Sequence, residues 1–204
     1  MDYKAHREYL KNIMTRIFKN NNNLHDYLLN SAISMGLKVK ANQIFFSNNS
    51  DQEPFWDFTI YEKINGKKSL YDISLENDFL SADETDYLKK MIIFETALYR
   101  IGKSDGEIVH ITNIENGNEY RLSDINLSKQ KHDGNYIFFR LLKNEEYYMG
   151  SGFYFYFPQE VIETVIRRKK ILIKSKYKIN KSITLFRVMF MLYKMYGILA
   201  EYRD

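Results

Sequence analysis

The sequence predicts an α+β fold, with a small antiparallel sheet flanked by N-terminal and C-terminal helices. Short alternating runs fill residues 107–158, and the turn dipeptides Asn116-Gly117 and Asp133-Gly134 separate them. Apolar runs split by Asn-Gly are the strongest local signal for a hairpin, because a type I′ turn needs positive φ at both central residues. Helical periodicity before and after this region predicts the flanking helices.

The N-terminal part of the chain is expected to be helical. Apolar side chains recur at helical spacing over residues 2–19 and again over 24–35, which favours two helices. Gly36 suits the left-handed position that commonly ends a helix. Beyond it we expect a strand at 38–46 and a polar loop at 47–54.

Two more helices are expected before the chain enters the sheet. The stretch 67–79 fits a helix or a strand, and we favour a short helix. Ser81 and Glu84 have the spacing of a capping box, in which each side chain bonds to the other residue's backbone N–H. The helix that they start is expected to reach about Glu95, and residues 97–101 are expected to enter the sheet.

The C-terminal part is predicted to form helices at 159–172 and 182–202. The apolar stretch 183–200 has about the length of a membrane span, but it contains two cations, each costing about 2.5–3.5 kcal/mol near a bilayer centre. We therefore expect no membrane span. The last helix is expected to be a core helix or one face of a homodimer, with a membrane-surface role as the alternative. Its polar positions are expected to share one face: Thr184, Arg187, Lys194 and Glu201.

Composition limits the class of protein and its chemistry. The chain has 204 residues, of which 45% are hydrophobic and 27% charged, and it has no cysteine. These values are typical of a globular protein, and they exclude disulfides, thiol catalysis and the usual ligands of structural zinc. The charged N-terminus does not resemble a signal peptide, so a cytoplasmic location is expected. We divide the chain into 1–36, 37–158 and 159–204, expected to form one compact unit.

The charge of the chain is unevenly distributed. Residues 1–162 carry 19 Lys and Arg against 23 Asp and Glu, whereas residues 163–204 carry 11 against 3. No acidic residue lies between Glu163 and Glu201. Such a concentration of one sign favours an anionic partner, and nucleic acid phosphates, anionic lipid or an acidic patch on a protein would all fit.

The basic stretch 167–181 is the first candidate site. Because Tyr177 lies among its lysines, the stretch could follow a phosphate backbone and stack one base. The alternative is a solvated helix end and loop that serve solubility. The candidate nucleic-acid-binding residues are Arg167, Arg168, Lys169, Lys170, Lys174, Lys176, Tyr177, Lys178 and Lys181.

The stretch 150–157 offers a second candidate. Phe153, Phe155 and Phe157 alternate with Tyr154 and Tyr156, so the two residue types lie on opposite faces of a strand. We expect the Phe face to lie on the core and the Tyr face to be half exposed, with a stacking platform for bases as the alternative. The sequence Gly150-Ser151-Gly152 is interpreted as a bulge or a close approach within a strand.

Catalytic and metal-binding patterns are weak. The four histidines are scattered, and His110, in an expected strand, is interpreted as a core or half-buried residue. The chain has no Walker A, GxGxxG or GxSxG motif, so we expect no cofactor and no metal. The clustered carboxylates are interpreted as solvated faces, with a metal-dependent hydrolase as the alternative: Asp57, Glu62, Asp72, Glu76 and Asp78.

The order of motifs in residues 55–158 resembles a family of uncharacterised bacterial proteins. Members combine an aromatic segment of the form F-x-W-F-x-F-D with a hairpin of the form R-D-L-x-T-G-E-E-Y. The resemblance implies an α+β fold with a small, curved, barrel-like sheet, and it implies no reaction. The matching positions are Phe55-Trp56-Asp57-Phe58, the stretch from Thr112 to Leu122, Ser128, Asp133-Gly134, Phe139-Arg140-Leu141-Leu142, and Ser151-Gly152 to Pro158.

The chain departs from this family in three ways. Asp57 precedes the aromatic pair in a slightly different frame. Asn113 stands where the family usually has Asp, and the cysteine-rich SEC-C-type zinc tail of some members is absent. A zinc-linked role is therefore not carried over. Within the matching part, Arg140 is expected to form an ion pair that fixes strand register, with Glu119 or an acid on a covering helix, or else to contact a ligand.

These observations lead to three functional hypotheses. The first is a non-enzymatic interaction protein that binds an anionic partner, nucleic acid or an acidic protein surface, through the basic C-terminal segment. The second is a protein–protein adaptor or inhibitor that acts through an apolar or acidic surface, with a possible homodimer through 182–202. The third is the metal-dependent hydrolase.

Overall fold

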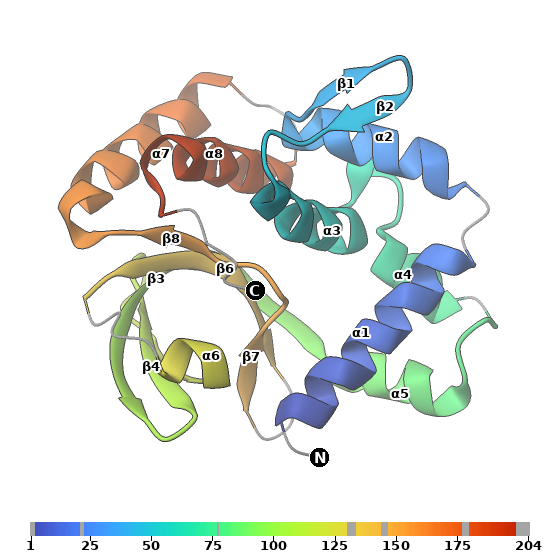
Figure 1. Cartoon of the computed structure of the whole chain (residues 1–204), viewed down its shortest axis with the longest axis horizontal. Helices are drawn as coiled ribbons and strands as arrows, with labels where there is room; N and C mark the ends of the chain where they lie inside the picture. Colours follow the sequence, from blue (N-terminus) through green and yellow to red (C-terminus); the bar gives the residue numbers. More distant parts are fainter. Residues whose placement is uncertain are drawn as a thin grey trace. The chain divides into compact units, whose positions relative to one another are not determined.

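The computed structural model describes residues 3–20, 23–76, 78–129, 134–143, 147–176 and 180–198. The chain divides into two compact units, Met1–Ile92 and Ile93–Asp204. Helices and strands both occur, with a six-stranded sheet in the second unit (Figure 1). The α+β class is thus confirmed, whereas the division at 36/37 and 158/159 stays a prediction.

The first unit begins with the two predicted helices, α1 (Tyr3–Lys19) and α2 (Leu24–Met35). Gly36 ends α2 with a φ of 93°, and its N–H bonds to the carbonyls of Ala32 and Ile33. A Cβ atom is unfavourable at this left-handed position, so the sequence-based interpretation of Gly36 is confirmed.

The prediction of a single strand at 38–46 is wrong, because the chain reverses direction within this stretch. Strands β1 (Lys38–Lys40) and β2 (Gln43–Phe45) form an antiparallel hairpin. Ala41 and Asn42 make the turn with φ values of 49° and 58°. The loop expected at 47–54 is also too long, since η1 (Asn49–Asp51) and α3 (Gln52–Tyr61) begin inside it.

The helices that follow are short. After η2 (Ile64–Gly66) comes α4 (Leu70–Glu76), the short helix favoured from the sequence. The next helix, α5 (Ala82–Lys90), begins with the predicted capping box. It ends before Glu95, contrary to expectation, because residues from Ile92 onward pair as a strand.

The second unit is built on a ring of hydrogen-bonded strands. The sheet order is β3-β4-β5-β7-β6-β8, and an additional pairing of β3 with β6 closes the ring. The pairings β3–β4, β4–β5, β6–β7 and β6–β8 are antiparallel, whereas β5 and β7 are parallel. The expectation of an antiparallel sheet is therefore wrong for the β5–β7 pair. The strands are β3 (Ile92–Asp105), β4 (Ile108–Asn113), β5 (Glu119–Ser123), β6 (Tyr136–Lys143), β7 (Tyr148–Gly150) and β8 (Phe155–Phe157).

The predicted hairpin around Asn116-Gly117 is present, but its turn differs from the prediction. Asn113 N–H bonds to the Asn118 carbonyl at 2.8 Å, which leaves four residues in the loop. Gly117 has a φ of 76°, and Asn116 is not among the residues with positive φ. Asn113 Oδ1 accepts from Glu115 N–H at 2.8 Å, and this side-chain bond favours the longer loop.

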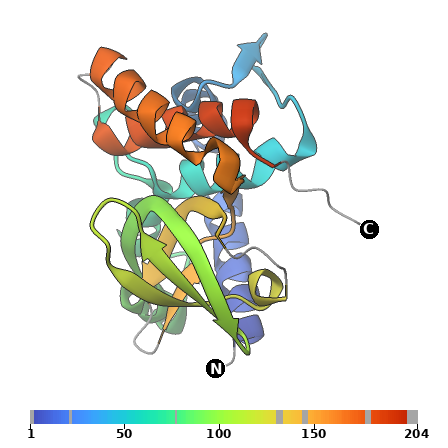
Figure 2. The ribbon, with the colours of Figure 1, turned by 90° about the vertical axis from the view of Figure 1, so that its left-hand side faces the viewer.

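One hydrophobic core of the second unit lies inside the ring. Short helix α6 (Ile125–Ser128) lies at one end of the ring and contributes Leu127 to this core (Figures 1 and 2). The inward side chains alternate along each strand, as a pleated strand requires. They include Tyr99, Ile101, Val109, Ile111, Leu122, Ile137, Phe139 and Leu141.

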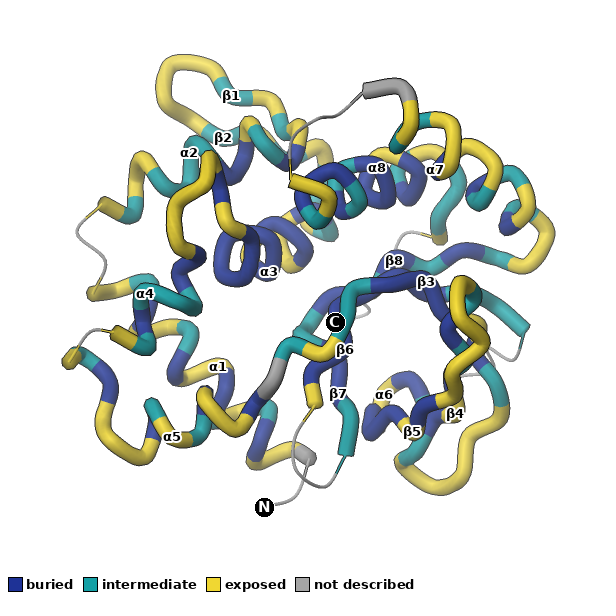
Figure 3. The backbone as a smooth tube through the Cα atoms, turned by 180° about the vertical axis from the view of Figure 1, so that it is seen from behind, coloured by how far each residue is buried: buried dark blue, intermediate teal, exposed yellow. Residues whose placement is uncertain are grey.

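Two C-terminal helices follow the sheet. A 3-10 turn, η3 (Gln159–Val161), leads into α7 (Ile162–Lys176), which extends past the expected end at 172. Helix α8 (Lys181–Tyr196) ends earlier than the predicted residue 202, and residues 199–204 lie outside the described part. Figure 3 shows α8 buried along much of its length, and α7 exposed along one side.

Helix α8 is a core helix, as the sequence predicted. Phe186 packs against Phe153 and Phe155 at centroid distances of 5.1 and 5.7 Å, and Tyr193 stacks on Phe155 at 4.8 Å. The expected polar face is only partly formed. Thr184 is buried, and its hydroxyl bonds to the Asn180 carbonyl at 3.1 Å.

Candidate functional site

The basic stretch forms the outward side of α7. Arg167, Lys170 and Lys174 are all exposed, and their spacing of three and four residues places them on one face of the helix. Val165, by contrast, is fully buried. The sequence pattern of α7 therefore produces an amphipathic helix whose solvent face is cationic. We call Arg167, Lys170 and Lys174 the α7 cationic face.

Lys169 points away from this face. It is buried, and its ammonium forms an ion pair with Glu115 in the β4–β5 loop. The side chain of Lys169 is 8% exposed, whereas that of Glu115 is 57% exposed. A buried ammonium is stable only with a compensating partner, so Lys169 holds α7 on the hairpin.

The other predicted residues are distributed around the helix pair. Arg168 places its guanidinium over the Tyr196 ring of α8, 5.4 Å from the centroid, a distance at which cation–π attraction operates. Lys181 is exposed at the start of α8. The side chain of Lys176 and the whole of Tyr177 and Lys178 lie outside the described residues, so the stacking role predicted for Tyr177 has no structural description.

A shallow hollow lies on the α7 cationic face. Two of its lining side chains are cationic, Arg167 and Lys170, and two are apolar, Ile166 and Ile171; Glu163 completes the lining. Ile171 is 58% exposed. The hollow thus combines apolar walls with two cations.

The Phe and Tyr faces of residues 153–157 are arranged as predicted. The three Phe residues are at most 1% exposed, and Tyr154 and Tyr156 are half-buried. Tyr154 packs on Phe139 at a centroid distance of 5.0 Å and donates to Asp124 Oδ2 at 2.5 Å. Because this face packs on the ring core, the structure offers no support for a stacking platform there.

Gly150 permits the position of Tyr154. A Cβ atom on Gly150 would lie 2.9 Å from Cζ of Tyr154, closer than real Cβ contacts come. The close approach expected at Gly150-Ser151-Gly152 is therefore confirmed. Asp124 also accepts N–H bonds from Asn126 and Leu127 at 3.0 and 2.8 Å, so its carboxylate fixes both α6 and the tyrosine.

Arg140 lies buried in the middle of β6. Its guanidinium donates to the Thr96 hydroxyl at 3.1 Å. Thr96 belongs to β3, the strand whose pairing with β6 closes the ring. The contact supports a role in strand register, and the ion pair expected for Arg140 stays a prediction.

The carboxylates do not assemble a metal site in the described part of the chain, where no group of three potential His, Cys, Asp or Glu ligands occurs. Asp57 and Glu62 are buried, contrary to the interpretation of a solvated face. Asp72 pairs with Lys63 at 3.2 Å and Glu76 with Lys68 at 2.6 Å.

The histidines are also dispersed. His6 is buried and its Nδ1 lies 2.9 Å from the Tyr87 hydroxyl. His110 is exposed on β4, because the pleat turns it opposite to buried Val109 and Ile111. Its interpretation as a core or half-buried residue is therefore wrong. His132 lies outside the described residues.

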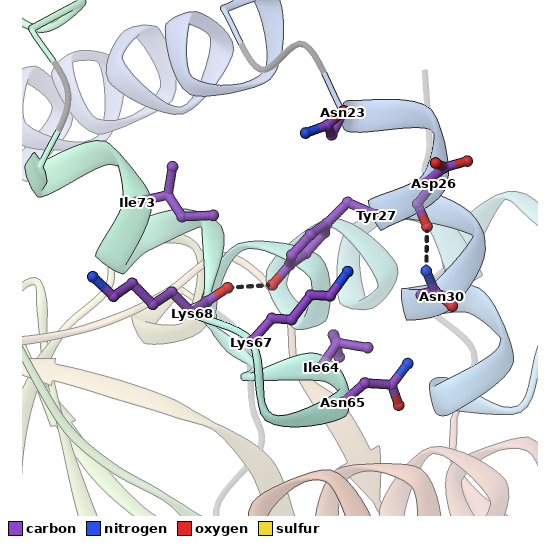
Figure 4. Close-up of a pocket in the computed structure, with 9 residues that line it drawn as sticks. All are labelled: Asn23, Asp26, Tyr27, Asn30, Ile64, Asn65, Lys67, Lys68 and Ile73. Atoms are coloured by element: carbon purple, nitrogen blue, oxygen red, sulfur yellow. Dashed lines mark hydrogen bonds between the residues drawn. The ribbon is translucent and has the colours of Figure 1, made fainter.

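A polar pocket of about 420 Å³ in the first unit gave no recognisable sequence signal (Figure 4). Tyr27 forms its floor, with the hydroxyl 3.0 Å from the Glu62 carbonyl and 3.3 Å from the Lys68 carbonyl. Burial, with a smaller contribution from the Asp72 carboxylate, raises the pKa of Tyr27 to about 12. The other lining residues are Asn23, Asp26, Asn30, Ile64, Asn65, Lys67, Lys68 and Ile73.

Comparison with protein families adds a classification. A model described as "Family of unknown function (DUF7986)" matches residues 1–203. The chain belongs to this family. No curated protein and no solved structure shows a significant match. The expectation of an uncharacterised family is confirmed, whereas the motif-level resemblance of residues 55–158 stays a prediction.

The sequence also predicted that the apolar C-terminal helix does not span a membrane. Among the residues that the structure describes, no helix is long and apolar enough to cross a membrane. The family description names no activity. An argument about function therefore depends on the geometry of the α7 cationic face and of the residues around it.

Proposed function

We propose that the chain is a non-enzymatic nucleic-acid-binding protein and that the α7 cationic face is its contact surface. The observation that carries this proposal is the exposure of Arg167, Lys170 and Lys174 on one helix face. Arg168 follows Arg167 in the same helix, and Lys181 is an exposed cation at the start of α8. The ring of strands, a small barrel-like sheet in this proposal, is the scaffold that holds α7.

The spacing of the cations supports a phosphate partner. Residues 167 to 174 span about 10 Å at the helical rise of about 1.5 Å per residue. This distance is close to the Debye length of about 10 Å at 0.1 M salt, so the three charges act together on an approaching polyanion. No acidic residue occurs on α7 after Glu163. The positive potential of the three cations is therefore not reduced by a carboxylate further along the helix.

A cytoplasmic location is part of the proposal. A chain without cysteine needs no oxidising compartment for its folding. Nucleic acid would be accessible to it in the cytoplasm, and an acidic protein surface is the alternative partner for the same face.

The test is a fluorescence-anisotropy titration of labelled DNA and RNA at about 50 mM and about 200 mM salt. The variant replaces Arg167, Lys170 and Lys174 by Gln and leaves Lys169 in place, because Lys169 is buried and paired with Glu115 and does not belong to the α7 cationic face. Three lost phosphate contacts reduce the slope of log K against log salt by about 2 for a single strand.

A matched control removes the same charge elsewhere. Lys38, Lys40 and Lys67 are exposed lysines of the first unit, and their replacement by Gln changes the net charge equally. We expect this control to keep near wild-type affinity and salt dependence. Equal losses in both variants, or no binding by the wild type at low salt, would contradict the proposal.

A second candidate function is self-association or adaptor binding through α8. Met191 and Met195 are 39% and 53% exposed, and their spacing of four residues places them on one side of the helix. Exposed apolar residues grouped in this way are typical of a protein contact. Sedimentation velocity tests the homodimer: Met191→Lys with Met195→Lys should abolish any dimer of the wild type.

A further inference from the structure

The hollow on the α7 cationic face points to the form of nucleic acid that is bound. Its walls include Ile166 and Ile171, with Arg167 and Lys170 beside them. Ile171 remains 58% exposed, although isoleucine is among the residues most often buried. A purely electrostatic phosphate contact requires no apolar wall.

We propose that this hollow receives one unstacked base of a single-stranded nucleic acid, an inference that rests on the proposed function. The base lies against Ile171 with the Arg167 guanidinium parallel to its face, because guanidinium planes stack on bases. Lys170 and Lys174 then bind the neighbouring phosphates. Glu163, at the N-terminal rim of the hollow, repels phosphate there and so favours placing the backbone toward Lys174.

Double-stranded nucleic acid fits this arrangement less well. Bases of a duplex are stacked and paired, and extruding one of them costs a few kcal/mol. In a single strand the same base is already available, so this cost does not arise. The hollow therefore adds affinity for single strands that the cations alone do not provide.

A lipid surface is the other polyanion that basic and apolar residues can bind. Helices that lie in a membrane interface present a broad apolar face with large side chains opposite their charges. On α7 the apolar residues of the outward side are the two walls of a hollow, and they alternate with cations instead of forming a separate face. This geometry favours a planar ring as the occupant.

The test compares ligands that offer unpaired bases with ligands that do not. The full-length protein is titrated with four labelled ligands about 12 nucleotides long: single-stranded DNA, single-stranded RNA, the DNA duplex, and an abasic DNA strand. We expect both single strands to bind about tenfold more tightly than the duplex and the abasic strand. The abasic strand keeps every phosphate, so this difference measures the base contact alone.

A matched pair of variants locates the contact. Ile171→Ser removes one wall of the hollow, and Ile33→Ser is the control, because Ile171 and Ile33 are 58% and 57% exposed. Ile171→Ser should lower single-strand affinity about tenfold while leaving abasic-strand affinity and the salt slope unchanged. Ile33→Ser should change neither affinity.

The outcomes separate this inference from the proposed function. Equal binding of single-stranded, abasic and duplex ligands, with loss in the triple Gln variant, would overturn the base contact and leave the charge-based proposal standing. Binding to none of the four ligands at low salt would overturn both. Tighter binding to vesicles of anionic phospholipid than to any single strand would identify a lipid surface and contradict the inference.

Discussion

Lys169 of α7 is buried and paired with Glu115 at the tip of the β4–β5 hairpin, although both neighbours of Lys169 are exposed cations. Hydrogen bonds connect this ion pair, through Asn113, to Glu95 on β3. Asn113 donates to both Glu95 oxygens at 3.1 Å, and its own Oδ1 accepts from Glu115 N–H. The contacts therefore fix the loop that holds Lys169 and, through Lys169, the orientation of α7.

The first prediction uses the unequal burial of this pair. Glu115→Gln leaves a buried ammonium without its carboxylate, so we expect a loss of about 1–2 kcal/mol in the free energy of unfolding. Lys169→Met removes the buried charge and keeps the apolar stem, while exposed Glu115 is hydrated again, and we expect a change below about 1 kcal/mol. Urea denaturation measures both values; equal losses would contradict the assigned asymmetry.

The same pair gives a second prediction, on binding. Because Lys169 is occupied inside the protein, Lys169→Met should leave oligonucleotide affinity within about twofold of wild type at low salt. Lys170→Gln removes an exposed charge of the α7 cationic face and should reduce both affinity and the salt slope, by about 0.7 for one phosphate contact. A larger binding loss for Lys169→Met than for Lys170→Gln would show that the faces of α7 are assigned wrongly.

The third prediction concerns Asn113, where the resembling family usually has Asp. In Asn113→Asp a carboxylate replaces the amide that donates to Glu95, so two like charges face each other. We expect a loss of about 1–3 kcal/mol at neutral pH. The repulsion raises the folded-state pKa of the carboxyl pair, so the penalty should fade as the pH falls and one carboxyl is protonated. Urea titrations at neutral and acidic pH check this; a penalty independent of pH would contradict it.

The fourth prediction follows from the pKa of Tyr27, raised to about 12. Unfolded tyrosine ionises near pH 10, so the stabilisation from Tyr27 is complete below that pH and is lost as the pH rises toward 12. Tyr27→Phe should cost about 1 kcal/mol at neutral pH, through loss of its hydroxyl bond, and should flatten the alkaline decline. Stability curves of both proteins at several pH values decide this; unchanged steepness would contradict it.

The fifth prediction couples Gly150 with Tyr154. Gly150→Ala places a methyl group against the tyrosine, 2.9 Å from Cζ, and should cost about 1–3 kcal/mol by overpacking. Tyr154→Phe removes the hydroxyl that bonds to Asp124 and relieves part of the contact. The double variant should therefore lose less than the sum of the single losses. Strict additivity in urea denaturation would show that the two residues are not in contact.

Local patterns in the sequence predicted much of the fold. The capping box at Ser81 and Glu84 and the terminator Gly36 are set by backbone groups a few residues away, so short-range patterns determine them. The end of α5 was missed because pairing of β3 with distant strands overrides the helical pattern between Lys90 and Glu95. The parallel pairing of β5 with β7 likewise joins residues that are far apart in the sequence, so no short-range pattern predicts it.

The candidate site was predictable only in part. The cluster of cations in the sequence predicted a candidate site in the stretch that forms α7. Helical spacing then places Arg167, Lys170 and Lys174 on one face. The inward orientation of Lys169 depends on Glu115, which is 54 positions away in the chain, and no local pattern records that contact. The same reason explains why the polar pocket at Tyr27 was missed, since α2 and the segment from residue 64 to 73 meet only in the folded unit.

The most direct test of the central claim is NMR mapping of backbone amide shifts in the full-length 24.5 kDa chain, recorded with and without a single-stranded oligonucleotide. The account predicts that the largest shifts occur between Glu163 and Lys174, with small shifts in the first unit. Largest shifts at the pocket around Tyr27, or on strands far from α7, would contradict the assignment of α7 as the nucleic-acid contact.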